Sequence, residues 1–175
     1  PTFISDAANK FGSSTIVVAI EAIKQTDGRY LAYVDNGREE TGIEVIQWAR
    51  QIEELGAGEL IITSVDREGT AEGFDIDLIK SISNVVNIPV IAHGGASTMS
   101  NIIDAVQVGN ASALAIASIF HYASMKKLVH TNSDNIEGNN TFKNSGKNFS
   151  IIEPCNISDV KNLFKINKIP CRPIN

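Results

Sequence analysis

The chain has 175 residues, 43% of them hydrophobic, and a formal net charge of −5. This length and apolar content predict one soluble globular domain with a substantial core. The acidic balance argues against a nucleic-acid-binding protein, although Gly-rich backbone amides and helix N-termini can still bind a phosphorylated small molecule. No apolar run approaches the roughly 18 residues that a membrane span needs, so we expect no membrane insertion.

The cysteines and the first residues bear on the cellular compartment. Cys155 and Cys171 are the only two cysteines of the chain. Residues 1–6 have neither the basic nor the apolar segment of a secretory signal. We therefore expect a cytoplasmic protein with two free thiols.

The first part of the chain predicts a helix, a buried strand and a hairpin. Residues 3–11 have the pattern of a helix that ends at Gly12. The apolar run 15–20 follows as a buried strand, which we expect to end at Glu21. Residues 30–34 lie between two turns rich in Asp, Asn and Gly, which predicts a strand of a small hairpin.

A helix and a second buried strand come next. The helix is predicted over 43–55, with Ile43 on its inner stripe and Gly56 as its end. The strand is predicted over 59–65 and leads into the polar loop 66–73.

The remaining elements continue the alternation of helices and strands. They are a helix over 75–86, a strand opened by Pro89, a helix over 101–108 capped by Ser97 or Thr98, and a strand over 113–116. A first helix followed by four βα units can form either an open doubly wound sheet or a closed barrel. Polar and small residues follow every strand at its C-terminal end, as barrel active sites require, which favours a (β/α)8 barrel of the TIM type.

The composition changes after the fourth strand. Residues 131–156 are rich in Asn, Ser, Gly and Lys, which predicts a long inserted polar loop. The loop is interpreted either as a solvated segment or as a lid or partner-docking segment on the catalytic face. Ser158 is expected to cap a last helix over 159–166. We interpret 1–175 as a single half-barrel domain that carries this insertion.

Four motifs stand at the ends of the predicted strands. They are Val17–Ala22 (VVAIEA), Thr63–Thr70 (TSVDREGT), His93–Ala96 (HGGA) and Ala117–His121 (ASIFH). Together they resemble the cyclase subunit of imidazole glycerol phosphate synthase, over about residues 1–122 and again over 157–172. That family has an eight-stranded barrel built from two similar halves, and this chain resembles the second half. Four strands cannot close such a barrel, so the resemblance implies a fragment or a half-barrel that pairs with another copy.

The resemblance implies an ammonia-dependent cyclase and lyase of histidine biosynthesis. In that family a glutaminase subunit supplies ammonia, which cleaves and cyclises a phosphoribulosyl aminoimidazole carboxamide nucleotide to imidazole glycerol phosphate. No metal or organic cofactor is implied, and His121 and His130 have no Cys or carboxylate constellation around them that would predict a metal site. Two opposed carboxylates act as acid and base. Glu21 stands at the fifth-strand position, and the first-strand partner is outside this sequence.

The phosphate site is predicted from small residues at two strand ends. Gly94 and Gly95 let backbone N–H groups approach a phosphate closely, and Ala117 with Ser118 supplies the facing wall. By resemblance, Asp66 and Glu68 orient the substrate. Gly69 and Thr70 are expected on the ligand-facing rim, and His93 either recognises the substrate or fills space. By resemblance, Glu59 belongs to a charged gate that controls ammonia entry.

Position 21 departs from the resemblance, because the usual family residue there is Asp. The extra methylene of Glu21 moves the carboxylate by about 1 Å, which can cost roughly a hundredfold in rate. Two alternatives follow: a cyclase-like subunit of an amidotransferase in bacterial surface-polysaccharide amino-sugar synthesis, or a non-catalytic half-barrel that binds phosphate or a partner. A lone half-barrel is also expected to be inactive and to self-associate through its strand edges and apolar inner face.

Overall fold

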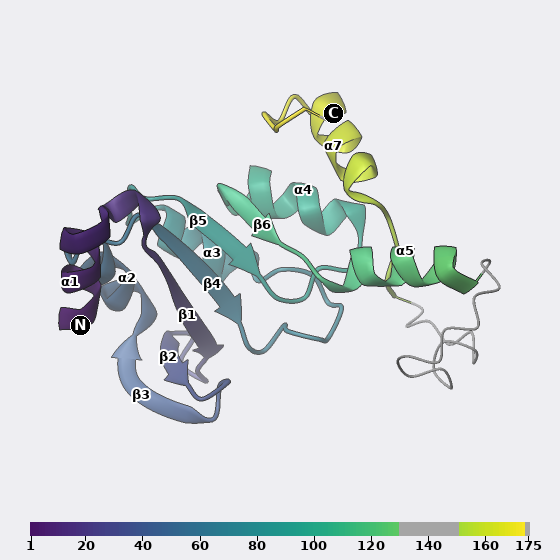
Figure 1. Cartoon of the computed structure of the whole chain (residues 1–175). Coiled ribbons are helices and arrows are strands. Elements are labelled where there is room, and N and C mark those ends of the chain that lie inside the picture. The colour runs from purple at the N-terminus through teal and green to yellow at the C-terminus, as the bar shows by residue number, and fades with distance from the viewer. Residues whose placement is uncertain (130–150, 174–175) are drawn as a thin grey trace.

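The computed structural model describes residues 1–129 and 151–173, and its elements alternate as the hydrophobic pattern predicts (Figure 1). The helices are α1 (Thr2–Phe11), the 3-10 turn η1 (Ser13–Thr15), α2 (Val45–Glu54), α3 (Ile76–Ser83), α4 (Met99–Gln107), α5 (Ser118–Val129) and α7 (Ile157–Ile166). The strands are β1 (Val17–Lys24), β2 (Tyr30–Val34), β3 (Glu39–Glu44), β4 (Glu59–Ser64), β5 (Val90–His93) and β6 (Ala113–Ala115).

The strands of the described residues form one sheet in the order β3-β2-β1-β4-β5-β6. Neighbours among β1, β4, β5 and β6 are parallel, and the connections between them contain helices. β2 and β3 form the predicted hairpin, which pairs antiparallel with the outer edge of β1 (Figure 1). This pairing covers only residues 21–24 of β1.

One face of the sheet is packed against helices and the other is open. Ile20 of β1 and Leu60 of β4 are buried with Ile52 of α2 in the main hydrophobic core, to which α3 and α4 also contribute. Side chains alternate along a strand, so the residues next to these point to the opposite face. There Val17 is 46% exposed and Ala19 is exposed as well. The open face therefore carries apolar side chains without a cover among the described residues.

The position of the helices decides between the two predicted architectures. A doubly wound sheet has helices on both faces, whereas a barrel has helices outside and strand side chains inside. Helices α2, α3 and α4 all pack against the same face of the four parallel strands. The chain is therefore part of a (β/α)8 barrel, as predicted.

The predicted start of the second helix was wrong. Ile43 lies in β3 rather than on the inner stripe of a helix, and it is 40% exposed. Helix α2 starts at Val45, because the side chain of Glu44 accepts a hydrogen bond from the N–H of Gln47 (2.9 Å) and caps the helix.

Other helix boundaries also differ from the prediction, and one predicted cap is confirmed. Helix α3 ends at Ser83, three residues early. Helix α7 starts at Ile157 with Asn156 as its cap, so Ser158 is not the cap. Thr98 caps α4 as predicted, in a capping box.

The polar segment 131–156 divides into two parts. Residues 131–150 lie outside the described residues, so the interpretation of that part is unchanged. Residues 151–156 lead back to the fold, and Cys155 is 8% exposed in a second hydrophobic cluster with Ile102 of α4 and Ile119 of α5. This end of the segment is packed, and a solvated loop is the wrong description for it.

Candidate functional site

A row of aligned residues crosses the open face of the sheet. Glu21 of β1 pairs in register with Thr63 of β4, Thr63 with His93 of β5, and His93 with Ala115 of β6. Aligned residues of neighbouring parallel strands point to the same face. The row therefore brings a carboxylate, a hydroxyl and an imidazole together near the C-terminal ends of the strands.

Glu21 does not end its strand as predicted, because β1 continues to Lys24. The hairpin holds its side chain: the N–H of Gly37 donates a hydrogen bond to Oε2 of Glu21 (2.9 Å). An ionised carboxylate has about four lone-pair sites, so this contact orients the group and leaves other sites for a ligand. Glu21 is half-buried.

Thr63 and His93 are joined by a hydrogen bond between Oγ1 and Nδ1 (3.0 Å). Either the hydroxyl donates to an unprotonated Nδ1 or a protonated Nδ1 donates to the hydroxyl. Thr63 is 9% exposed, so this hydrogen bond holds the imidazole of His93 on the side that faces the protein interior. Sequence reasoning included Thr63 in a motif but missed it as the partner of His93.

A cavity of about 180 Å³ lies at the C-terminal ends of β5 and β6. Its wall includes many of the predicted phosphate-site residues: Glu68, Gly69, His93, Gly94, Gly95, Ala117 and Ser118. Ala71, Ala96, Ala115, Ile116 and Ile152 complete the lining. We call this cavity the anion pocket, after the phosphate site that the sequence predicts there. Residues from three strand ends and from the end of the polar segment thus meet in one place.

Gly94 and Gly95 of the anion pocket have no room for a side chain. Gly94 and Gly95 have φ of 100° and 90°, in the region that favours glycine. A Cβ on Gly94 would lie 2.8 Å from the carbonyl oxygen of Ser64, and one on Gly95 would meet the carbonyl oxygen of Gly73. The N–H of Gly73 also donates to the carbonyl of Gly95 (2.7 Å). The two glycines therefore allow the loops to pack closely, in addition to the close approach of a phosphate that the sequence predicts.

Helix α5 starts at the opposite wall of the anion pocket. Ala117 and Ser118 line the pocket, and the N–H of His121 bonds to the carbonyl of Ala117 (2.9 Å), which forms the first helical turn. The first N–H groups of a helix have no intrahelical partner and carry a partial positive charge. A phosphate in the pocket can accept hydrogen bonds from such groups.

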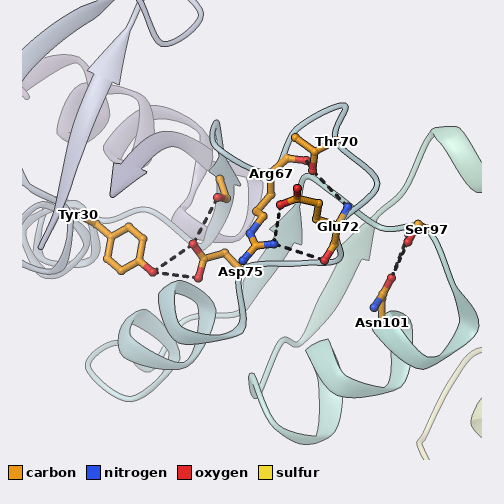
Figure 2. A network of polar contacts seen from close by, with 8 residues as sticks. Tyr30, Arg67, Thr70, Glu72, Asp75, Ser97 and Asn101 are labelled. Carbon is orange, nitrogen blue, oxygen red and sulfur yellow. Dashed lines mark hydrogen bonds and ion pairs between the residues drawn. The ribbon is translucent and has the colours of Figure 1, made fainter. Parts of the chain in front are cut away.

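Asp66 and Thr70 lie outside the anion pocket. Asp66 accepts a hydrogen bond from the N–H of Lys24 (2.8 Å) and faces a separate hollow of about 440 Å³. The hydroxyl of Thr70 donates to the carbonyl of Arg67 (2.8 Å) and accepts from the N–H of Glu72, which holds the turn (Figure 2). In the loop after β4, Glu68 and Gly69 thus line the pocket, whereas Thr70 stabilises the conformation of the loop itself.

Glu59 stands at the other end of the sheet. It is the first residue of β4 and pairs in register with Val17 of β1. Its position at the N-terminal ends of the strands is the bottom of a barrel, where the resemblance implies an ammonia gate.

A buried polar network connects the hairpin to α3. The hydroxyl of Tyr30 donates to the carboxylate of Asp75 (3.0 and 3.1 Å; Figure 2). The same carboxylate caps α3 by accepting from the N–H of Leu78. Ser64 contacts the same carboxylate at 3.5 Å. Burial, with Asp75 beside it, raises the pKa of the Tyr30 phenol. The only sequence signal for the network was an Asp just before a helical pattern.

The described residues carry neither a metal-ion cluster nor a membrane helix. No group of three or more His, Cys, Asp or Glu side chains in them could hold a metal ion. Likewise, no helix there has the length and apolar character that crossing a membrane requires.

The helices on one face of the sheet, the row of polar side chains and the pocket at the strand ends define a β/α-barrel protein. Residues 1–126 match the family model described as "Histidine biosynthesis protein", and the chain belongs to that family.

Two curated relatives share the name "Imidazole glycerol phosphate synthase subunit HisF". The protein from Alkaliphilus metalliredigens (strain QYMF) is 49% identical over 122 residues, which are 70% of this chain and 48% of the relative. The protein from Prochlorococcus marinus (strain MIT 9215) is 47% identical over 123 residues, or 69% of this chain and 48% of the relative. The chain thus spans about half the length of the curated relatives it matches.

Proposed function

We propose that this chain acts as the phosphate-binding half of an ammonia-dependent cyclase of the imidazole glycerol phosphate synthase type, in histidine biosynthesis. The names of the two relatives support the reaction class. A complete barrel supplies the opposing carboxylate, so the chain alone is inactive in this proposal. A biosynthetic role of this kind places the protein in the cytoplasm.

The observation that carries the proposal is that Glu21 and the anion pocket share one edge of the open face. Glu21 and His93 are two strands apart in one register row, and His93 lines the pocket. With strands about 4.8 Å apart, the two Cα positions are separated by about 10 Å. A substrate anchored by its phosphate in the pocket can therefore extend across the face to the carboxylate of Glu21.

Glu21 acts as the acid or base in this proposal. Proton transfer by a positioned carboxylate typically contributes 10²–10⁴-fold to a rate. Glu68 orients the substrate, Gly69 belongs to the rim, and the pocket residues Gly94, Gly95, Ala117 and Ser118 hold the phosphate. No metal or organic cofactor takes part.

Ammonia arrives from a glutaminase partner subunit at the opposite end of the barrel. Glu59 begins β4 there and is half-buried. A charged residue at this entrance fits a gate through which a small neutral molecule passes to the open face.

The second candidate is a subunit of an amidotransferase that acts on an amino sugar of a bacterial surface polysaccharide. Glu at position 21, where the resemblance has Asp, is the observation that favours it. The carboxylate still lies on the open face and is held by Gly37. A substrate of different shape would accommodate the longer side chain.

Turnover with ammonia tests the proposal. The chain would be assembled with the complementary half of the Alkaliphilus relative, and conversion of the histidine-pathway nucleotide measured with and without Glu21→Gln. We expect Glu21→Gln to lower the rate by roughly a hundredfold or more. Glu39→Gln, on the exposed strand β3, is the matched control and should leave the rate unchanged. Equal rates for the wild type and Glu21→Gln would overturn the catalytic assignment.

A further inference from the structure

The end of the polar segment reaches the anion pocket. Ile152 lines the pocket together with the strand-end residues. The residue lies beyond position 126, where the family match ends. One wall of the pocket is therefore supplied by a part of the chain that the family match does not cover. We call residues 151–156 the return segment.

The return segment is fastened on the C-terminal side of Ile152. The N–H of Glu153 donates to the carbonyl of Ser97 (2.7 Å), in the loop that follows Gly94 and Gly95. Ser97 is 2% exposed, and its hydroxyl donates to Oδ1 of Asn101 (2.9 Å), so the acceptor is itself fixed (Figure 2). Cys155 is 8% exposed in the second hydrophobic cluster. Ile152 is thus held in place by backbone and core contacts.

Ile152 and Ile116 are the two large apolar side chains among the residues that line the pocket. Gly94, Gly95 and the first residues of α5 line the pocket, and backbone N–H groups of such residues suit the oxygens of an anion. Ile152 is half-buried and packs against the second hydrophobic cluster, and its branched side chain offers only apolar contact. The pocket therefore combines an anion-binding side with an apolar side.

We propose that Ile152 is a specificity-determining residue that makes the pocket select phosphate monoesters over inorganic phosphate. The proposal rests on the proposed phosphate role of the pocket. The backbone N–H groups bind the phosphate oxygens, and the carbon next to the ester oxygen packs against Ile152. One methylene-sized contact in an apolar site is worth roughly tenfold in binding.

Binding of inorganic phosphate and of ethyl phosphate to the full chain tests the proposal. Both dissociation constants would be measured by calorimetry, with the amide signals of Gly94 and Gly95 followed by NMR to verify the site. Ethyl phosphate is expected to bind more tightly to the wild type. Ile152→Ala should remove this preference, by roughly tenfold, and leave inorganic phosphate within about twofold, because the Glu153 backbone contact is kept.

Two further variants make the result specific. Ile151→Ala removes the same side chain one position earlier, where it is 58% exposed, and should change neither constant. Ile152→Val keeps most of the apolar surface and should keep most of the preference.

Three results would count against the inference, and they differ from one another. Unchanged preference in Ile152→Ala, with both ligands bound, would overturn the role of Ile152 alone. An equal loss of both ligands would show that Ile152 supports the fold of the pocket and does not select. If neither ligand binds the wild type at the glycine amides, the phosphate assignment fails and this inference fails with it.

Discussion

Thr63 Oγ1 and His93 Nδ1 lie 3.0 Å apart across the neighbouring strands β4 and β5. The contact fixes the imidazole in the same register row as Glu21, so the polar groups of the open face have defined mutual positions. His93 also lines the anion pocket. The bond therefore links the carboxylate side of the candidate site to its phosphate side.

Added negative charge at the start of α5 should weaken anion binding. Ser118→Asp introduces a carboxylate into the wall of the anion pocket, and like charges repel. An acidic residue in the first turn suits a helix, so we expect the fold to be kept. The dissociation constant for inorganic phosphate, measured by calorimetry, should rise by roughly tenfold or more.

The control for this prediction is in the same helix. Ser124→Asp adds the same charge at an exposed position farther along α5 and should leave the affinity nearly unchanged. Similar affinities for wild type and Ser118→Asp would remove the phosphate assignment. Gly95→Asp is a poorer test, because a side chain there meets the backbone of Gly73.

Shortening the side chain at position 21 separates the two candidate functions. If the substrate is the histidine-pathway nucleotide, Glu21→Asp in a complete barrel should raise ammonia-dependent turnover, by up to roughly a hundredfold, because it restores the shorter reach. If the substrate is an amino sugar, turnover of the nucleotide should not improve and activity on the sugar should fall. A wild-type rate of roughly 1 per second or more on the nucleotide would show that the longer side chain is no handicap.

Tyr30→Phe should destabilise the chain near neutral pH. The variant loses the hydrogen bond from the phenol to Asp75 at a 7% exposed position. A hydrogen bond to a charged group is worth about 1.5–3 kcal/mol, which sets the expected loss in the free energy of unfolding. Urea denaturation at pH 7 measures it. Tyr33→Phe, which affects a contact with the exposed Glu40, should cost less.

The same phenol should make stability fall at alkaline pH. Burial raises the pKa of Tyr30 above its unfolded value of about 10, so its contribution is complete below that pH and is lost as the pH rises toward the folded-state pKa. Between pH 9 and 11 the wild type should therefore lose more free energy of unfolding than Tyr30→Phe does. Parallel curves would contradict this explanation.

The two thiols should differ in reactivity. Cys171 is exposed, whereas Cys155 is buried and its pKa is raised by burial and by the carboxylates of Asp159 and Glu153. Iodoacetamide at pH 8 should therefore modify Cys171 first, with the rate at Cys155 at least roughly tenfold lower. Peptide mass spectrometry measures both rates, and they should converge in denaturant. Equal rates without denaturant would show that the return segment opens readily.

The open face should cause the chain to self-associate. Val17 is 46% exposed there, and we expect sedimentation to show a dimer or a larger species. Val17→Lys should shift the equilibrium toward the monomer. Val108→Lys, at the C-cap of α4 and 50% exposed, is the matched control and should have no effect. A dilute wild-type monomer that unfolds cooperatively would show that this face needs no cover.

Much of the fold could be predicted because local patterns coincide with tertiary packing. The buried strands are apolar runs, and Thr98 has a recognisable cap geometry that the structure confirms. β3 escaped prediction because its residues are polar and mostly exposed, so only pairing with β2 makes it a strand. Ile43 was therefore assigned to the following helix.

The candidate site could be predicted only where its residues are adjacent in sequence. The glycine pair and Ala117 with Ser118 form short motifs, and they meet in one pocket. The Thr63 contact depends on the register between strands that are 30 residues apart, which no local pattern specifies. Ile152 stands at the end of a long polar segment, and only its packing shows that it reaches the pocket.

The hairpin also limits how a missing half could join this one. It occupies residues 21–24 on the outer edge of β1, which leaves only 17–20 of that edge unpaired within the described residues. If an added strand paired with this edge one residue out of register, all of its side chains would point to the wrong face of the sheet. The hairpin thus fixes the register of pairing, because a strand that pairs with this edge and abuts the hairpin has a single position along β1.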